Sequence, residues 1–300
     1  MDQCVKPLGV NSDENPPSIR FSRVENNSRP VSRCLMPASL PRLPETGKVR
    51  AMRLLAWNIR QGGRSRLSRI ADALKRHDAD IVVLSEYRGG PSASRLCAAL
   101  HALGYSHATT LVPPPSRNGV LVAARRPFRG QGAVDMGLPE PYRMVSVDFA
   151  TFRLIGIYMP NLLAKIPYWE ALIASLSSQS ASRSLAIGDF NTCRAYLDEA
   201  GAIDATAHYM DAIEQIGFRD LWRHRYPDRR EYSWFSTRNN GFRIDHAFLS
   251  QELAACAGTV HYSHEERIAG LSDHSPLILE LAVMTILAGS AGIHRNWWLT

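Results

Sequence analysis

Short apolar runs recur along the chain from residue 53 to residue 281, with amphipathic segments between them. Runs of this kind, rich in Val, Ile and Leu, are typical of buried strands, and apolar residues at helical spacing are typical of packed helices. The runs predict strands at 53–58, 81–84, 119–123, 144–148, 152–158, 185–188, 244–249 and 276–281. The helical spacing predicts helices at 65–77, 92–102, 165–178 and 208–216. Consecutive strands mixed with strand–helix–strand units indicate two packed sheets with helices on their outer faces.

The two ends of the chain lack this pattern. Residues 1–50 are rich in Pro and Ser and have no sustained apolar period, so burial cannot repay the entropy of ordering them. We expect a disordered leader over 1–50, a compact domain over 51–282 and a tail over 283–300 to which the sequence assigns no role. Because the first strand pattern starts at Met52, translation from that methionine is an alternative to Met1.

Charge and cysteine content restrict the partners and the compartment. The 35 Lys and Arg residues exceed the 28 Asp and Glu residues, and the net charge of +7 favours polyanions such as nucleic acid or an anionic membrane surface. The 5 cysteines are widely separated and form no C-x-x-C pair, which argues against a disulfide framework or a thiolate zinc site. We therefore expect a reducing, cytoplasmic location. No apolar run is long enough to span a bilayer, and nothing in the sequence demands more than a monomer.

Polar side chains that could take part in catalysis or metal binding follow several of the predicted strands. Loops at strand ends commonly carry function, because the sheet behind them is rigid. Carboxylate, amide and imidazole groups together form an oxygen-rich pocket that suits Mg²⁺ and a phosphate. The candidate residues at these ends are Asn58, Glu86, Tyr158, Asn161, Asp189, Asn191, Asp245, Asp273 and His274.

Each candidate also has a purely structural interpretation. Glu86 alone is typical of a solvated strand end, and Asp189 with Asn191 is typical of an Asx turn. The Asp273-His274 dipeptide occurs in ordinary turns and helix caps. In the chemical interpretation, Asp245 orients His274, since a histidine needs such a partner to fix its tautomer and pKa. His246 is assigned a structural role.

The order of these fragments resembles a known family. Six short motifs occur between about residues 53 and 281 in the order found in the endonuclease/exonuclease/phosphatase superfamily, whose fold is like that of DNase I. They are Trp57-Asn58-Ile59, Ser85-Glu86, Ile157-Tyr158-Met159-Pro160-Asn161, Gly188-Asp189-Phe190-Asn191, Arg243-Ile244-Asp245 and Ser272-Asp273-His274-Ser275-Pro276. The segment Tyr232-Ser233-Trp234-Phe235 resembles the aromatic substrate-contact loop of the exonuclease III branch, which includes AP endonucleases. Trp234 and Phe235 are also compatible with ordinary sheet core.

The resemblance implies an α/β fold, a four-layer α/β/β/α sandwich of two mainly antiparallel sheets flanked by helices. It also implies a metal site in which Glu86 binds Mg²⁺, with Mn²⁺ as an alternative. Asn58 would lie beside the ion, and Asp273 would serve a metal or its bound water.

The resemblance further implies the catalytic roles. Asp189 would orient or deprotonate the attacking water, Asn191 would hold the scissile phosphate, and Tyr158 would contact that phosphate or the leaving oxygen. His274, oriented by Asp245, would stabilise the developing negative charge. The residues expected to contact substrate are Asn161, Trp234, Phe235, Phe242 and Arg243.

The sequence departs from the family pattern at two places. Arg60 stands where the repair nucleases often carry an acidic or amide residue, and Leu162-Leu163 follow Asn161 where small or polar residues are usual. The sequence therefore supports a preference for abasic sites less strongly than it supports phosphodiester hydrolysis.

Arginine clusters near 60–69, at 125–126 and at 219–230 favour nucleic acid, although each cluster is also typical of a solvated basic face. The expected function is metal-dependent hydrolysis of double-stranded DNA. Two alternatives stay open, namely a phosphatase or phosphodiesterase of phospholipid or inositol phosphate, and a nucleic-acid-binding homologue that has lost catalysis.

Overall fold

The computed structural model describes residues 49–133, 137–178, 183–201 and 204–284. The first strand already begins at Val49, two residues before the expected start of the domain. The rest of the predicted leader, and the tail from residue 285 on, lie outside the described residues, so those two predictions are untested. No helix among the described residues is both long and apolar enough to cross a membrane.

The first sheet has six strands. Their order across the sheet is β13 (Ala257–Tyr262), β14 (Leu277–Met284), β1 (Val49–Asn58), β2 (Ile81–Tyr87), β4 (Gly119–Ala124) and β3 (His107–Thr109). Strands β1 and β2 are parallel, and the other neighbours are antiparallel. Two helices, α1 (Leu67–His77) and α2 (Pro91–Ala102), belong to this half of the domain.

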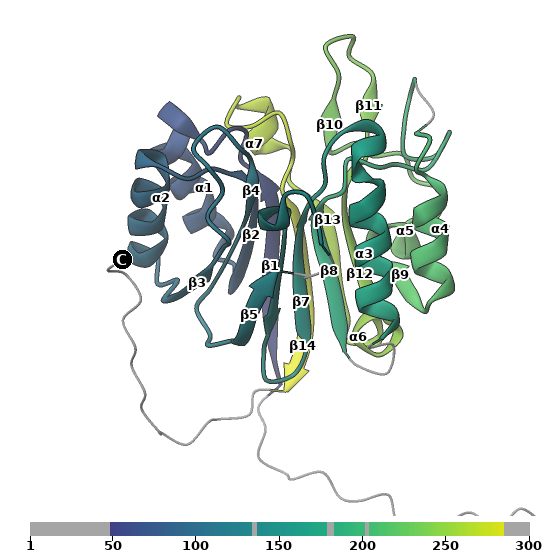
Figure 1. The fold of residues 1–300 in the computed structure, drawn as a ribbon, viewed down its shortest axis with the longest axis horizontal. Coiled ribbons are helices and arrows are strands. Elements are labelled where there is room, and N and C mark those ends of the chain that lie inside the picture. The colour runs from purple at the N-terminus through teal and green to yellow at the C-terminus, as the bar shows by residue number, and fades with distance from the viewer. Residues whose placement is uncertain (1–48, 134–136, 179–182, 202–203, 285–300) are drawn as a thin grey trace, which may run out of the picture. The chain divides into compact units, whose positions relative to one another are not determined.

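The second sheet also has six strands. Their order is β5 (Arg129–Ala133), β6 (Met144–Asp148), β7 (Arg153–Tyr158), β8 (Ser184–Asp189), β12 (Asp245–Ser250) and β9 (Phe218–Asp220). Strands β7 and β8 are parallel, and the other neighbours are antiparallel. Helices α3 (Ile166–Ser177) and α4 (His208–Gln215) cover its outer face (Figure 1).

The remaining elements are short. They are the hairpin strands β10 (Trp234–Phe235) and β11 (Gly241–Phe242), helices α5 (Leu221–Arg225), α6 (Gln251–Ala255) and α7 (Glu265–Ile268), and the 3-10 turns η1 (Arg64–Arg66), η2 (Pro141–Arg143) and η3 (Leu162–Lys165). The β10–β11 hairpin projects from the same end of the domain as α7 (Figure 1).

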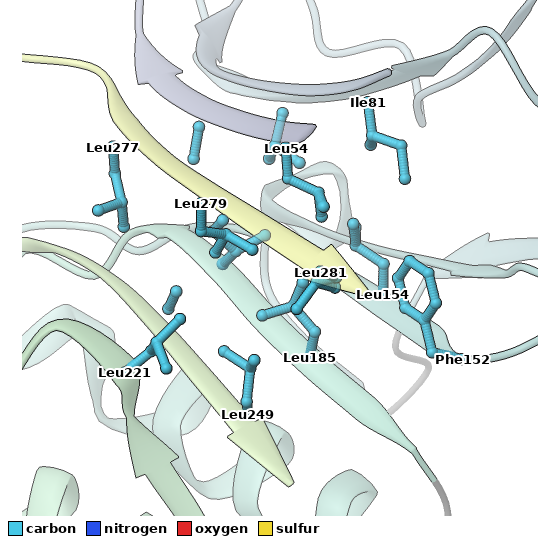
Figure 2. Close-up of a cluster of buried hydrophobic side chains, with 14 of the residues drawn as sticks. Leu54, Ile81, Phe152, Leu154, Leu185, Leu221, Leu249, Leu277, Leu279 and Leu281 are labelled. Carbon is cyan, nitrogen blue, oxygen red and sulfur yellow. The ribbon is translucent and has the colours of Figure 1, made fainter. Parts of the chain in front are cut away.

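Alternating side chains assemble the layers, because successive residues of a strand point to opposite faces of the sheet. In β1, Leu54 joins the cluster between the two sheets, while Leu55 and Trp57 join the cluster under α1 and α2. Leu185 of β8 faces the same central cluster, whereas Ala186 faces α3 and α4. Figure 2 shows leucines from both sheets meeting in the central layer. The predicted four-layer α/β/β/α sandwich is confirmed.

Candidate active site

Strand register brings the predicted residues of the second sheet to one edge. Tyr158 at the end of β7 is paired with Asp189 at the end of β8, and Asp189 is paired with Asp245 at the start of β12. Three adjacent strands therefore present three functional side chains side by side. In the first sheet, Asn58 at the end of β1 lies opposite Ser85 of β2. The Ser85 hydroxyl donates to the carbonyl of Ile157 at 3.0 Å, which ties the two sheets together next to the site.

Glu86 leaves its strand at an irregularity. The pairing of β2 with β4 shifts between Ser85 and Tyr87, and Glu86 has a left-handed φ of 57°. Bulges of this kind re-aim a side chain and are common beside active sites. The backbone N–H of Gln61 donates to Glu86 Oε2 at 2.6 Å, and Asn58 Nδ2 lies 3.4 Å from Oε1. The bulge therefore directs the carboxylate toward the end of β1.

Asp189 depends on the glycine before it. Gly188 has a φ of 143°, and a Cβ there would lie 2.1 Å from the carbonyl oxygen of Ile157, so only glycine fits. Asp189 is 1% exposed and accepts hydrogen bonds from Asn58 Nδ2 at 2.9 Å and from the backbone N–H of Asn191 at 2.9 Å. Asn191 has a left-handed φ of 47°, and its side-chain amide donates to the Met159 carbonyl at 2.8 Å.

His274 closes the arrangement from the loop before β14. Its Nδ1 lies 2.8 Å from Asp245 Oδ2, and its Nε2 lies 4.0 Å from Asp189 Oδ2. The indole N–H of Trp57 donates to the His274 carbonyl at 3.0 Å, which fixes the backbone of the histidine. The ligand atoms of Asp189, Asp245 and His274 all lie within 4.8 Å of one another.

Burial and proximity shift the protonation of this cluster. Burial first, and then the neighbouring Asp245, raise the pKa of Asp189 to about 7, although His274 and Asn58 oppose the rise. Burial opposes a charged imidazole at His274, but the carboxylates of Asp245 and Asp189 outweigh it and raise the pKa of His274 to about 10. At neutral pH, His274 is therefore a cation held between two acidic groups.

The donor set fits a hard divalent cation. Glu86 Oε1 receives only long contacts of 3.4 Å from Asn58 and Tyr158, so that oxygen is available to a further partner. Carboxylate oxygens are ligands that Mg²⁺ prefers. Asn58 orients its Nδ2, a hydrogen-bond donor, toward Glu86, and its Oδ1 accepts from the backbone N–H of Arg60 at 2.9 Å, so Asn58 lies beside this oxygen but turns no ligand atom toward it. Asp273 is placed differently from the other predicted ligands, since its carboxylate is 39% exposed and lies 3.8 Å from Arg60 Nε. The assignment of Glu86, Asn58 and Asp273 to a metal stays a prediction.

One residue of the site was not predicted. Asn118 Nδ2 donates to the Tyr158 hydroxyl at 3.2 Å, and that hydroxyl lies 3.4 Å from Glu86 Oε1. Burial first, with Glu86 and Asp189 nearby, raises the pKa of Tyr158 to about 12, so the phenol stays protonated. Asn118 directly precedes its strand, whereas the predicted site residues were chosen because they follow strands. An asparagine directly before the Gly119 strand was the available signal.

The aromatic segment forms the β10–β11 hairpin beside the site. Trp234 pairs with His274 through an isolated bridge, and their rings lie 6.3 Å apart. The ring of Phe242 lies 5.5 Å from that of Trp234. Phe235 packs under Arg267, whose guanidinium lies 4.4 Å from the ring centre. All three aromatic side chains are half-buried, and Asn161 is exposed at the start of η3. Their contacts with substrate stay predictions.

The structure contradicts the substrate contact expected of Arg243. Its side chain is fully buried, with hydrogen bonds to Asp198 and Asp220 at 2.7–3.1 Å. An arginine with no exposed surface cannot reach a phosphate. Sequence alone could not show this, because both aspartates come from distant segments. His246, assigned a structural role, is also buried and contacts Asp220 and the Thr192 carbonyl.

Several arginines at 219–230 bind partners within the protein, which the sequence did not indicate. Arg223 is buried against Asp198 and donates to four backbone carbonyls. Arg225 donates to the Ala257 carbonyl, and Arg229 pairs with Glu231 at 3.0 Å. This segment therefore adds less free positive charge than a count of its arginines implies.

Comparison with known proteins decides the family. The sequence profile of the Endonuclease/Exonuclease/phosphatase family matches residues 55–274. The chain belongs to this family. Among the curated relatives of this chain, the exodeoxyribonuclease of Bacillus subtilis (strain 168) is 26% identical over 257 residues, which cover 76% of this chain and 98% of that protein. Recombination repair protein 1 of Drosophila melanogaster is 29% identical over 162 residues, which cover 46% of this chain and 23% of that protein.

Solved structures share the fold. An AP endonuclease from Archaeoglobus fulgidus matches with a TM-score of 0.68 and 22% identity, covering 77% of this chain and 100% of that one. The 3′ phosphatase NExo from Neisseria, bound to a product DNA hairpin, matches with a TM-score of 0.68 and 23% identity, covering 77% of this chain and 99% of that one. The predicted resemblance to the endonuclease/exonuclease/phosphatase superfamily is confirmed by the family match, and these solved structures support the fold.

Proposed function

We propose that the chain is a divalent-metal-dependent phosphodiesterase acting on double-stranded DNA, in the manner of the exonuclease III branch. The observation that carries the proposal is the cluster of Asp189, Asp245 and His274 within 4.8 Å. Membership of a nuclease and phosphatase family supports hydrolysis of phosphate esters. The relatives named as an exodeoxyribonuclease and an AP endonuclease support DNA as the substrate.

We assign each part of the reaction to a side chain of the site. Asp189, held by two hydrogen bonds, accepts a proton from the attacking water. His274, positioned by Asp245, supplies the positive charge that stabilises the oxyanion developing on the phosphate. Tyr158 stays protonated and donates toward the substrate phosphate, while Asn118 fixes the position of its hydroxyl. Asn191 contributes a hydrogen bond to the same phosphate group.

The metal would be held by Glu86, Asn58 would lie beside it, and Asp273 would serve a bound water. When bound, Mg²⁺ or Mn²⁺ supplies Lewis-acid stabilisation of the phosphoryl oxygens. Glu86 is suited to this part because Gln61 holds one carboxylate oxygen and leaves the other with only long contacts.

Abasic-site incision is the proposed specificity. The hairpin sets Trp234 beside His274 and Phe242 beside Trp234, so aromatic rings border the reacting groups. Rings in this position can flank an extruded sugar or stack on a neighbouring base. An abasic nucleotide is easily extruded, because it has no base to unstack.

The test compares three substrates in Mg²⁺ and in EDTA, namely a labelled duplex with one abasic-site analogue, the matched intact duplex and a vesicle containing phosphoinositide. We expect incision at the analogue in Mg²⁺ and none in EDTA. Phosphate release from the vesicle with both duplexes intact would refute the DNA assignment in favour of a lipid phosphatase. Binding of duplex without hydrolysis of any substrate would indicate a homologue that has lost catalysis.

A further inference from the structure

Lys165 is a buried lysine beside the candidate active site. It ends the 3-10 turn η3, and its side chain is only 2% exposed. A buried ammonium group is unfavourable unless it has hydrogen-bonding or charged partners. Its Nζ donates to the backbone carbonyl of Asn191 and lies 2.7 Å from Asp204 Oδ2. The other oxygen of Asp204 accepts from the backbone N–H of Thr206 at 2.8 Å, which holds the carboxylate in place. One partner of the buried lysine is therefore the backbone of a predicted catalytic residue.

The turn after β8 is held by three side-chain donors, one on each of three consecutive carbonyls. The Thr192 hydroxyl donates to the Phe190 carbonyl at 2.9 Å, Lys165 Nζ donates to the Asn191 carbonyl, and His246 Nε2 lies 2.8 Å from the Thr192 carbonyl. Strand pairing cannot orient these peptide groups, because β8 has already ended. Lys165 is the only lysine or arginine among the three donors, and a charge-assisted hydrogen bond is about twice as strong as a neutral one.

The backbone of Asn191 explains why the turn needs such support. Its φ of 47° lies in the left-handed region, which costs free energy for a residue with a Cβ, although asparagine tolerates it better than most. Lys165 holds the peptide group that follows Asn191. The peptide group before Asn191 donates its N–H to Asp189 Oδ1 at 2.9 Å. With both flanking peptide groups held, the left-handed backbone cannot relax without breaking one of these two bonds.

This backbone conformation orients both side chains that the proposed reaction uses. The amide of Asn191 has two N–H donors. One of them donates to the Met159 carbonyl at 2.8 Å, so the other can donate to a phosphate. The N–H of the same residue holds Asp189 Oδ1. A displacement of about 1 Å at a catalytic group can lower a rate about a hundredfold, so the bond from Lys165 has a direct consequence for catalysis.

We propose that Lys165, paired with Asp204, is a positioning residue that holds Asn191 and Asp189 in their reactive arrangement. It acts through the backbone carbonyl of Asn191 and not through contact with the substrate. This inference rests on the proposed function, since it assigns a role in that reaction to a residue behind the reacting groups.

The first test compares two lysine variants. Lys165→Met removes the donor and keeps a long side chain in the buried position. We expect kcat on the abasic-analogue duplex in Mg²⁺ to fall at least about tenfold, with KM changed less than about threefold. The matched control Lys75→Met makes the same change at an exposed position of α1 and should keep the wild-type kcat. A wild-type kcat for Lys165→Met would overturn the inference.

A double variant separates positioning from stability. Lys165→Met leaves the Asp204 carboxylate without its cation, so the melting temperature should fall. Combining Lys165→Met with Asp204→Asn removes both charges, and the melting temperature should rise again while kcat stays low. All rates are measured well below the melting temperature of the least stable variant. Recovery of kcat together with the melting temperature would show that Lys165 only stabilises the fold, and would overturn the inference.

Hydrogen exchange makes the inference independent of turnover. The backbone N–H of Asn191 should exchange at least about tenfold faster in Lys165→Met and in the double variant than in the wild type, whereas the N–H groups in the middle of β8 should keep their protection. Unchanged exchange at Asn191 would overturn the inference even if kcat fell. Absence of cleavage by the wild type would instead refute the proposed function, and faster exchange at Asn191 would then still show that Lys165 fixes the turn.

Discussion

Replacing Arg243 with methionine tests whether this residue stabilises the fold from the inside. Its guanidinium makes two hydrogen bonds to Asp198, at 2.8 and 2.9 Å, and two to Asp220, at 3.1 and 2.7 Å. All three side chains have no exposed surface. Methionine has a similar length and no charge, so the variant leaves two buried carboxylates without their main partner.

The expected loss follows from the charges that remain. Removing one member of a buried ion pair destabilises a protein by about 3–5 kcal/mol, because the other charge stays desolvated. Arg223 still contacts Asp198, and Arg194 still lies 3.1 Å from Asp220. We therefore expect the lower end of the range, a decrease of about 3 kcal/mol in the free energy of unfolding at pH 7.

The pH dependence has a definite sign. Burial raises the pKa of Asp220, but Arg243 and His246 outweigh it and hold that pKa well below its usual value. A lowered pKa in the folded state stabilises the protein above the unfolded value of about 3.9, and this stabilisation is lost as the pH falls. The Arg243→Met variant lacks most of this stabilisation, because Arg243 is the main cause of the lowered pKa of Asp220. The deficit should therefore be largest at neutral pH and should narrow below about pH 4.

Urea unfolding followed by tryptophan fluorescence, at pH 7 and at pH 3.5–4, measures both effects. The control is Arg219→Met at an exposed position of β9, which should change stability by less than about 0.5 kcal/mol. A loss below about 1 kcal/mol for Arg243→Met would show that the buried Arg243 ion pairs do not stabilise the fold. So would a selective loss of DNA affinity in a variant of normal stability, since that would restore the substrate contact.

Three further predictions concern other parts of the domain. Gly188→Ala should lower stability by about 3 kcal/mol or more in urea unfolding, because its Cβ would lie 2.1 Å from a carbonyl oxygen, and an unchanged midpoint would contradict the assigned strain. Burial opposes ionisation of Glu266, but hydrogen bonds such as that from His77 lower its pKa to about 2. Glu266→Gln should therefore lower the free energy of unfolding by about 2 kcal/mol at pH 7. Thermal melts at decreasing pH should show the stability difference between variant and wild type vanish between about pH 4 and pH 2. Asn118→Ala should reduce kcat on duplex DNA about tenfold with little change in melting temperature, since Tyr158 loses its donor, and an unchanged kcat would remove Asn118 from the site.

The fold could be predicted largely because its strands are buried on both faces or alternate regularly. The runs at 81–84, 119–123 and 185–188 all lie within core strands, and the helix expected at 92–102 is α2, one residue longer. Short edge strands were missed. Strand β9 has only three residues. Strand β13 does not alternate regularly between buried and exposed residues and has a register shift, so neither strand gives a clear period.

The site could be predicted because its residues lie at strand ends, and the strand ends of both sheets meet at this site. Asp189, Asp245 and His274 converge as expected from residues that lie far apart in the sequence. The prediction for Arg243 was wrong because it depended on contacts between segments that show no helix or strand pattern in the sequence. The burial of Arg243 requires Asp198, which lies in a loop, and Asp220, which ends the unpredicted strand β9. The pairing of Arg60 with Asp273 is likewise visible only in three dimensions.

Asp189 is the proposed base in metal-dependent cleavage of DNA, and the variant Asp189→Asn removes that base. The variant keeps the shape of the side chain, and the matched control Asp211→Asn makes the same change at an exposed position of α4. Single-turnover cleavage of the abasic-analogue duplex in Mg²⁺ should fall at least about a hundredfold in Asp189→Asn, with unchanged affinity for the duplex, and should be normal in Asp211→Asn. Cleavage by Asp189→Asn at the wild-type rate would exclude Asp189 as the base.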